Sequence, residues 1–582
     1  MYKGIPASPG IVIGPAYVLS KRSDKAEKRK ISASEAAAET ERFKAAVEKT
    51  RTEIMAIRDR VVFDIGNKDA EIFNAYILLL KDQMFVGKAE KLISEQLVNS
   101  EYALSLVLKD YEEFFSRIAD SYLREKLRDI NGLVEKILAN LSEAGGKIDE
   151  MKGEYIVVAS DLSPADTADM DKSKVLGFIT ETGGATSHTA IVARSLEIPA
   201  VVGVRDITKT VKTGDTIVLD GEKGIAAINP PAKVLAAYRE ERKNYLKKLK
   251  LLRKLKTLEA VTLDGHKIKM SANIEFPEET SVVKENNADG IGLFRSEFIY
   301  IKSLNLPGEE EQFNAYRTAI EKMSPKPVTI RTLDIGGDKF LPYFKISPEQ
   351  NPFLGLRAIR LSLVNINIFK TQLRAILRAS AFGTVKIMFP MISTVEEIED
   401  AKRIVAEVMT ELSEKKVPFD REIKIGIMIE VPSAALMADE LAKKCDFFSV
   451  GTNDLIQYTL AVDRGNENVA RYYDALNPAV LRLIKKTTES AHRNGITTSV
   501  CGEMAGTPQI AFLLAGLGVD ELSVSPASIL SVKQLIRRIN FKDALETADA
   551  VLKMEKTGEI RDFINKKLSE LLFGAGEAEK EK

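Results

Sequence analysis

Apolar positions change their spacing several times along the chain, and each spacing predicts a different kind of element. Near the N-terminus, short β-type runs at 10–14 and 16–19 lie between glycine and proline turns. Strand-like runs return at 155–159, 215–220 and 224–228. We therefore expect the N-terminal strands to pair with the later ones in one α/β unit whose sequence is interrupted.

The segment between these two groups of strands has the pattern of helices. Residues 32–145 are charged and rich in alanine, and apolar residues recur three, four or seven positions apart, at Phe43, Val47, Ile54, Ile57 and Val61. This spacing places them on one face of a helix. The segment is predicted to form a bundle of about four long helices inserted into the α/β unit.

A basic stretch at 233–256 follows the last of these strands. It contains Lys247-Lys248-Leu249-Lys250 and Arg253-Lys254. A helix that binds nucleic acid or a membrane could have this composition, but a solvated linker helix agrees better with the balanced charge of the whole chain. We interpret the stretch as a linker between two moving halves.

Beyond residue 262 short apolar runs alternate with helical segments. The candidate strands are 267–273, 290–294, 328–333, 385–391, 423–429, 447–450, 497–500 and 521–524. Eight strands that alternate with helices over about 300 residues predict a (β/α)8 barrel, or TIM barrel, with its active site at the C-terminal ends of the strands.

The predicted fold class is therefore multidomain α/β, and 582 residues are enough for about three or four domains. The predicted domains are a discontinuous α/β domain at 1–31 and 146–230, an inserted helical domain at 32–145, a linker helix at 231–261, a TIM-barrel domain at 262–572 and a disordered charged tail at 573–582.

Composition narrows the class of partner and the compartment. Lysine plus arginine and aspartate plus glutamate both total 84, so the net charge gives no general attraction to nucleic acid or anionic membranes. No apolar run reaches the length of about 18 residues that a membrane span needs, and the N-terminus lacks a signal core. The two cysteines favour a reducing compartment. We expect a cytoplasmic protein with small-molecule and protein partners.

Charged and polar residues stand where the predicted barrel strands end. They are Arg295, Glu297, Arg331, Asp334, Lys339, Glu430, Asn453, Asp454, Arg464, Cys501 and Glu503. Any one of them could form a salt bridge at the rim. Several arginines at one mouth instead favour a small ligand with many anionic oxygens, because the guanidinium group pairs bidentately with phosphate or carboxylate.

Two of these acids, Glu430 and Asp454, follow adjacent strands. Carboxylate oxygens suit Mg²⁺ whose coordination is completed by water and substrate oxygens. The competing interpretation is that Glu430 only pairs with a neighbouring arginine. Dependence of the activity on a metal distinguishes the two.

The two cysteines need separate explanations. Cys445 starts the sixth strand, away from the predicted site, and is expected to be a core residue. Cys501 ends the seventh strand at the mouth. Core packing is the commoner role there too, but if the substrate is phosphoenolpyruvate, a thiol at this position can protonate the enolate that loss of phosphate leaves.

One of the three histidines, His188, lies in Gly183-Gly184-Ala185-Thr186-Ser187-His188-Thr189, ahead of an apolar helical run. Glycines let backbone N–H groups approach an anion, and a helix N-terminus favours negative charge. A phosphate-carrying nucleophile fits this setting. A hydrogen-bonded structural histidine fits the local sequence equally well, and zinc ligation fits it less well because no second ligand is near.

Together these motifs resemble Enzyme I of the bacterial sugar phosphotransferase system. The segment 183–189 is similar to the phosphohistidine segment of that family, and 292–298, 331–339, 351–355, 451–455 and 463–466 are similar to its barrel motifs. The resemblance implies a swivelling phosphohistidine α/β domain, a helical insert that binds the carrier protein HPr, and a barrel that binds phosphoenolpyruvate and pairs into a homodimer.

The resemblance also implies a role for each matching residue. His188 is phosphorylated, Thr167 helps to orient it, and Cys501 protonates the enolate. Phosphoenolpyruvate is held by Arg295, Arg331, Asn453, Asp454 and Arg464, Mg²⁺ is held by Glu430 and Asp454, and Lys339 and Arg357 have supporting roles. The implied reaction passes the phosphoryl group through His188 to a histidine of HPr and releases pyruvate, as the first step of sugar uptake.

Other classes share part of this signal. Pyruvate phosphate dikinase and phosphoenolpyruvate synthase resemble the same halves but need an additional ATP-binding domain, and the sequence contains no P-loop motif. A barrel lyase or aldolase could use Glu430, Asp454 and Mg²⁺ without a phosphohistidine. A regulatory protein could bind phosphoenolpyruvate without turning it over. A phosphorylation assay and pyruvate release separate these alternatives.

Overall fold

The computed structural model of the chain describes residues 1–19, 28–64, 76–77, 79–116, 133–134, 136–138, 140–141, 153–162, 170, 174–183, 189–190, 193, 198–303, 305–336, 349–463, 466 and 468–573. The chain divides into two compact units, 1–248 and 249–582. The finer domain limits that the sequence predicts, including the tail that begins at 573, stay a prediction.

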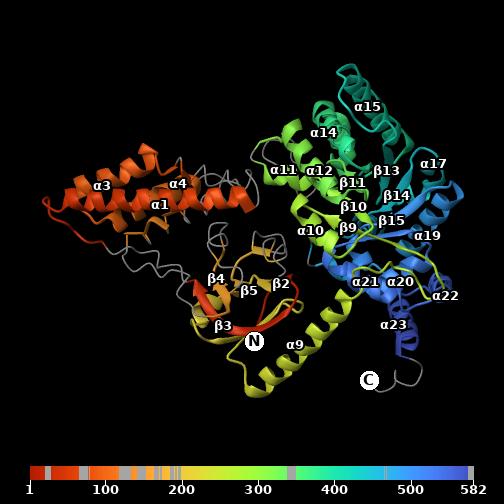
Figure 1. The fold of residues 1–582 in the computed structure, drawn as a ribbon, viewed down its shortest axis with the longest axis horizontal. Helices are drawn as coiled ribbons and strands as arrows, with labels where there is room; N and C mark the ends of the chain where they lie inside the picture. Colours follow the sequence, from red (N-terminus) through yellow and green to blue (C-terminus); the bar gives the residue numbers. More distant parts are fainter. Residues whose placement is uncertain are drawn as a thin grey trace. The chain divides into compact units, whose positions relative to one another are not determined.

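The first unit contains a mixed sheet of eight strands (Figure 1). In the order in which they lie, they are β1 (Tyr2–Lys3), β8 (Ile225–Ile228), β7 (Thr216–Asp220), β3 (Ile11–Leu19), β4 (Tyr155–Ala159), β5 (Val175–Thr180), β6 (Ala200–Val202) and β2 (Ile5–Ser8). The N-terminal strands pair with the later ones, since β3 is antiparallel to β7 and parallel to β4. The predicted α/β class is confirmed.

One continuous strand, β3, replaces the two strands predicted at 10–14 and 16–19. Residues 11–15 of β3 pair with β7, whereas 16–19 pair with β4. Pro15 therefore lies where the strand changes partner, and a strand tolerates proline where the ladder needs no N–H from it. The predicted break at Gly14-Pro15 is wrong for this reason.

Helices follow between β3 and β4, as the apolar spacing predicts. They are α1 (Ala36–Asp64), the π-helical turn η1 (Gln83–Gly87), α3 (Lys88–Gln96) and α4 (Ser100–Ser116). Phe43, Val47 and Ile54 are buried in one apolar cluster with residues of α3 and α4. The side chains of Ile57 and Val61, and the predicted number of four helices, lie outside the described residues.

Two further helices are α8 (Ile207–Thr210), in the first unit, and α9 (Ala232–Arg253), which continues past the limit of that unit at residue 248. The basic stretch is thus helical, and Tyr238 of α9 packs on Ile11, Val218 and Ala227 of the sheet.

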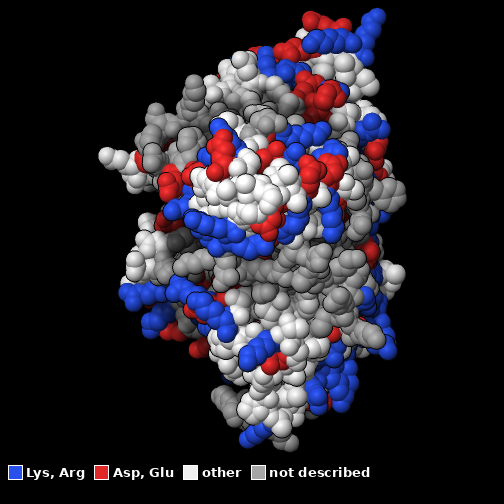
Figure 2. All heavy atoms as spheres, turned by 90° about the vertical axis from the view of Figure 1, so that its left-hand side faces the viewer, with Lys and Arg blue, Asp and Glu red and all other residues white. Residues whose placement is uncertain are grey.

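On the face shown in Figure 2, blue basic side chains lie beside red acidic ones, in keeping with the net charge of zero.

The second unit is built on a closed barrel in which each strand is parallel to its neighbours (Figure 1). Its strands are β9 (Lys269–Ile274), β10 (Gly290–Arg295), β11 (Val328–Arg331), β12 (Val385–Phe389), β13 (Lys424–Ile429), β14 (Phe447–Val450), β15 (Thr497–Val500) and β16 (Glu521–Val524). All eight predicted strands are present, with ends shifted by a few residues at most, so the TIM barrel is confirmed.

Helices cover the outside of the barrel. They are α10 (Thr280–Glu285), α11 (Glu297–Lys302), α12 (Glu309–Met323), α13 (Ala358–Val364), α14 (Ile366–Ala379), α15 (Val395–Glu414), α16 (Pro432–Leu436), α17 (Ala438–Ala442), α18 (Thr452–Leu460), α19 (Pro478–Arg493), α20 (Pro508–Gly516), α21 (Ile529–Ile536), α22 (Phe541–Val551) and α23 (Thr557–Phe573). Short 3₁₀ turns are η3 (Pro277–Glu279), η4 (Pro352–Leu354), η5 (Ser380–Phe382), η6 (Ala470–Tyr472), η7 (Glu503–Gly506) and η8 (Pro526–Ser528).

Helix α14 illustrates why these helices pack on the strands. Its buried side chains include Phe369, Leu373, Ile376 and Leu377, a helical spacing that presents one apolar face. That face joins the apolar cluster of the barrel.

None of the helices in the described ranges is long and apolar enough to cross a bilayer.

A buried carboxylate ties α1 to α4 in the helical segment. The Glu39 side chain is only 8% exposed and pairs with Arg42 at 2.7 Å, while its Oε1 accepts a 2.7 Å hydrogen bond from the Ser100 N–H at the start of α4. Burial alone would raise the pKa of Glu39, but the hydrogen bonds from Arg42 and Ser100 outweigh it and lower the pKa to about 2.

We predict that Glu39→Gln destabilises this helical segment by about 1–3 kcal/mol, because a buried charged hydrogen-bond network is broken. Hydrogen exchange of the α1 and α4 amides at neutral pH measures the loss. The exposed Glu41→Gln is the matched control, and equal exchange in the two variants would contradict the prediction. Because the folded pKa is depressed, the contribution is present above pH 4.5 and is lost as the pH falls toward 2 in the wild type, whereas the variant lacks this dependence.

Candidate active site

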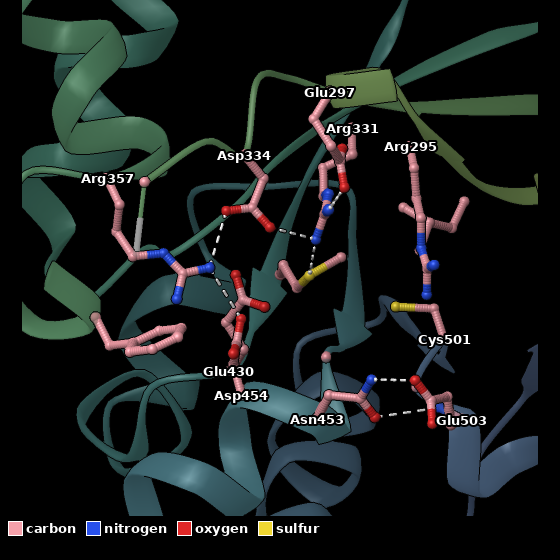
Figure 3. A pocket seen from close by; sticks show the side chains of 16 residues that line it. Arg295, Glu297, Arg331, Asp334, Arg357, Glu430, Asn453, Asp454, Cys501 and Glu503 are labelled. Atoms are coloured by element: carbon pink, nitrogen blue, oxygen red, sulfur yellow. Dashed lines mark hydrogen bonds and ion pairs between the residues drawn. The ribbon is translucent and has the colours of Figure 1, made fainter. Parts of the chain in front are cut away.

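A cavity opens at the C-terminal ends of the barrel strands (Figure 3). Its volume is about 110 Å³, whereas one water molecule needs only about 10–15 Å³, so it has room for a small organic anion. The lining is mostly polar and contains Arg295, Glu297, Arg331, Asp334, Arg357, Glu430, Asn453, Asp454, Cys501 and Glu503, with Leu293, Phe353 and Met428 as apolar members.

The barrel topology explains this convergence. Arg295 and Arg331 are the last residues of β10 and β11, Glu430 directly follows β13, and Cys501 directly follows β15. Parallel strands of a closed barrel all end on the same face, so residues distant in sequence meet there. Gly451 leaves room for one of these side chains, since a Cβ atom at 451 would lie 2.6 Å from Oε2 of Glu430 and would displace it.

Arg331 is held by two buried carboxylates. Its Nη2 lies 2.6 Å from Oε1 of Glu297, and its Nη1 lies 2.8 Å from Oδ2 of Asp334. Burial alone would lower the pKa of Arg331, but the charges of Asp334 and Glu297 raise it. The guanidinium group therefore stays charged and fixed in orientation.

Arg357 continues the same network. Its Nη2 lies 3.0 Å from Oδ1 of Asp334 and 3.2 Å from Oδ2 of Asp454, and its Nη1 donates to the Tyr458 hydroxyl at 2.9 Å. Asp334 thus bridges the two arginines (Figure 3). A charged chain of five side chains results, from Glu297 to Asp454.

Glu430 lies beside this chain and is almost completely buried. Its Oε1 accepts a 2.6 Å hydrogen bond from the Met391 N–H. Burial, and then the charges of Asp454 and Asp334, raise the pKa of Glu430 to about 8, although Arg331 and Arg357 oppose the shift. No arginine of the described ranges forms an ion pair with Glu430, so the alternative of a simple arginine pair finds no support there.

The two other lining groups with candidate chemistry are Arg295 and Cys501. Arg295 is about a quarter exposed, and its Nη1 pairs with Oε1 of Glu275 at 3.0 Å. Cys501 is 3% exposed and belongs to an apolar cluster with Leu293 and Met428. Burial raises the pKa of the Cys501 thiol, while the charge of Arg331 opposes the shift.

The donor set at the mouth fits a magnesium ion. No group of three or more metal-ligating side chains gathers anywhere in the part of the chain that the structure describes. Mg²⁺ is commonly bound by one or two carboxylates together with substrate phosphates and water, and Glu430 and Asp454 supply two carboxylates. Burial contributes most to the raised pKa of Glu430, and the charges of Asp454 and Asp334 raise this pKa further; a cation would offset both effects.

The structure brings Arg295, Arg331, Arg357, Glu430, Asn453, Asp454 and Cys501 together at one cavity. Their individual roles stay predictions. His188, Thr167, Lys339 and Arg464 lie outside the described residues. Cys445 contacts the barrel core, and its sulfur donates to the Leu441 carbonyl oxygen at 3.5 Å.

Several lining residues were given no role from the sequence. Glu297, Asp334 and Glu503 were placed at the mouth by their positions at strand ends, but no individual role was assigned to them. Leu293 and Met428 lie inside their strands and face the cavity, where only the alternation of side chains along β10 and β13 could have indicated them.

We predict that the protein without bound cation contains a glutamic acid that titrates near pH 8, because burial and two neighbouring carboxylates disfavour its charged form. Carbon-13 NMR of labelled glutamate carboxyl groups measures this titration. The group is protonated below that pH, and its signal is absent in Glu430→Gln but present in Glu414→Gln. A wild-type spectrum in which every glutamate is ionised by pH 6 would contradict the assignment.

The barrel, its arginine-rich mouth and its pair of carboxylates define an enzyme site for a small polyanion. Comparison with known proteins specifies the class. Residues 3–126, 151–224 and 249–541 match the N-terminal, mobile and phosphoenolpyruvate-binding domains of PEP-utilising enzymes, respectively.

Matches to individual proteins extend over almost the whole chain. The phosphoenolpyruvate-protein phosphotransferase of Staphylococcus carnosus (strain TM300) is 43% identical over 563 residues, which are 97% of this chain and 98% of the relative. That of Bacillus subtilis (strain 168) is 43% identical over 565 residues, with the same coverage. A solution NMR structure of Enzyme I is 38% identical and covers 42% of this chain and 99% of its own, with a TM-score of 0.35. This chain belongs to the phosphoenolpyruvate-protein phosphotransferase (Enzyme I) family, as its motifs predict.

Proposed function

We propose that this enzyme transfers the phosphoryl group of phosphoenolpyruvate to His188 and from there to a histidine of the carrier protein HPr, as the first step of sugar uptake. The observation that carries the proposal is the convergence of Arg295, Arg331 and Arg357 with two carboxylates and a thiol at one cavity. Such a set suits a substrate with a phosphate, a carboxylate and a carbon that must be protonated.

The arginines bind and orient the donor. Because Glu297 and Asp334 fix Arg331, its guanidinium group meets the substrate with little loss of conformational freedom. Asn453, Asp454 and Arg464 complete the substrate contacts, with Lys339 and Arg357 in support. Glu430 and Asp454 would hold Mg²⁺, which neutralises charge on the phosphoryl oxygens when it is bound.

The first transfer breaks the bond between phosphorus and the enol oxygen as a bond from Nε2 of His188 to phosphorus forms. Thr167 helps to orient the imidazole. The enolate that leaves takes the thiol proton of Cys501 at its methylene carbon and becomes pyruvate, and the thiolate regains a proton from water. The raised pKa of Cys501 supports this role, because the thiol keeps its proton at neutral pH until the enolate forms.

The second transfer needs a protein acceptor. We assign HPr binding to the helical insert, where Met84 of η1 exposes 72% of its surface. We also assign a homodimer contact to the barrel, on which Leu354, Leu436 and Tyr472 are each more than half exposed. The reaction takes place in the cytoplasm, and α9 acts as the linker that lets His188 reach both donor and acceptor.

We predict that phosphoenolpyruvate labelled in its phosphate and supplied with Mg²⁺ labels the protein at a base-stable, acid-labile position. His188→Ala abolishes the label, because no other side chain carries the group in this account. His266→Ala and His492→Ala are matched controls that keep it, since the chain has three histidines. Label on His188→Ala would contradict the assignment of His188 as the carrier, and no label on the wild type would favour the lyase or the regulatory alternative.

Replacement of Cys501 with alanine is expected to slow pyruvate formation by about 10²- to 10⁴-fold, the range that one general acid contributes. Binding of phosphoenolpyruvate is expected to change little, because the charged contacts remain. Cys445→Ala provides the matched control, since that cysteine lies away from the cavity lining. Equal pyruvate release by both variants would return Cys501 to a packing role.

A further inference from the structure

Glu503, the first residue of η7, contacts Asn453 through two hydrogen bonds of opposite polarity (Figure 3). Nδ2 of Asn453 donates to Oε1 of Glu503 at 3.0 Å. In return, the Glu503 backbone N–H donates to Oδ1 of Asn453 at 3.3 Å. One residue therefore contacts both ends of the same amide.

This pair of contacts distinguishes the two orientations of the Asn453 amide. If the amide turned by half a rotation, its oxygen would face the Glu503 carboxylate and its NH₂ group would face a backbone N–H. Both contacts would then be repulsive, because an acceptor would meet an acceptor and a donor a donor. Among the described residues, no hydrogen bond is formed by the second N–H of Asn453, so this N–H can donate to a ligand.

Local packing brings the two residues together. Gly502 lies so close to the start of α18 that a Cβ atom on it would be 1.7 Å from Oγ1 of Thr452. The Glu503 N–H is available because the first amides of a helical turn have no partner within it. On the other side, the Tyr473 hydroxyl donates to the Asn453 carbonyl oxygen at 3.2 Å and fixes the backbone.

The charge of Glu503 argues against a direct role in binding an anion. Glu503 lines the cavity and is exposed, and no lysine or arginine of the described ranges forms an ion pair with it. A carboxylate at this mouth repels a polyanionic substrate. Its presence is explained if it acts on Asn453 and not on the substrate.

We infer that Glu503 is a positioning residue that fixes the Asn453 amide so that an N–H, and not the oxygen, faces the anionic substrate. This inference rests on the proposed function, in which Asn453 contacts phosphoenolpyruvate. Glu503 is two residues after Cys501, so the segment that follows β15 carries both the proposed proton donor and the residue that fixes the substrate contact.

The test is a double-mutant cycle on the full chain. Equilibrium binding of phosphoenolpyruvate with Mg²⁺ is measured by calorimetry in a His188→Ala background, which prevents turnover. Glu503→Ala is expected to weaken binding about tenfold, the effect of losing one charged hydrogen bond. Glu503→Gln keeps an acceptor oxygen for Nδ2 and should stay within about threefold of the parent. Glu555→Ala, on an exposed residue of the barrel unit, is the surface control.

The effect of Glu503→Ala with and without the Asn453 side chain shows whether Glu503 acts by positioning Asn453 or by its own charge. In an Asn453→Ala background, Glu503→Ala should change affinity by less than about twofold, because the group it positions is absent. An additional tenfold loss there, or Glu503→Gln as weak as Glu503→Ala, would overturn the inference. A thermal unfolding midpoint equal to that of the parent protein establishes that each variant is folded.

The outcome also distinguishes this inference from the proposed function. If the wild type is phosphorylated but Glu503→Ala binds phosphoenolpyruvate like the parent, only the role of Glu503 is wrong. If the wild type neither binds nor is phosphorylated, the proposed function itself fails.

Discussion

Carboxylates outnumber arginines in the buried charge cluster at the barrel mouth, and much of the site depends on this imbalance. Glu297, Asp334, Glu430 and Asp454 surround Arg331 and Arg357. Charges removed from water are stable only when they are paired, so each arginine is held in one geometry by the acids around it. Burial, together with the surplus negative charge, raises the pKa of Glu430 and favours a proton or a cation at this carboxylate.

The barrel makes this cluster possible. Its strands end on one face, and the hydrogen-bonded sheet fixes the backbone beneath each charged side chain. Apolar residues line part of the cavity, where Leu293 and Met428 belong to the same buried cluster as Cys501. The same arrangement therefore keeps the arginines charged and the thiol protonated. Both states suit a donor that is a polyanion before transfer and an enolate after it.

Much of the fold and part of the site could be predicted from the sequence, and the limits have physical causes. The barrel strands were identified because each is a short buried run between helices, whereas β3 was divided because proline usually ends a strand. Arg331 and Glu430 were assigned through their places at strand ends. The bridging position of Asp334 could not be predicted, since it depends on how Arg331, at the end of β11, and Arg357, directly before α13, approach each other in three dimensions.

Glu503 shows the same limit more sharply. Its place after Cys501 is evident in the sequence, but a carboxylate beside an anion site looks unfavourable there. Only the two hydrogen bonds to Asn453 explain why a carboxylate stands at this position. A residue that acts through another residue is difficult to predict from sequence, because its role depends on a contact that exists only in the folded structure.

The central claim is that this mouth binds phosphoenolpyruvate through its arginines. Equilibrium binding of phosphoenolpyruvate in excess Mg²⁺ to Arg295→Met tests it most directly, because Arg295 is partly exposed and its loss leaves no carboxylate deeply buried without a partner. The account predicts an affinity at least about tenfold weaker than that of the wild type. Arg403→Met, at a surface ion pair on α15, should bind like the wild type. Wild-type affinity in Arg295→Met would contradict the account.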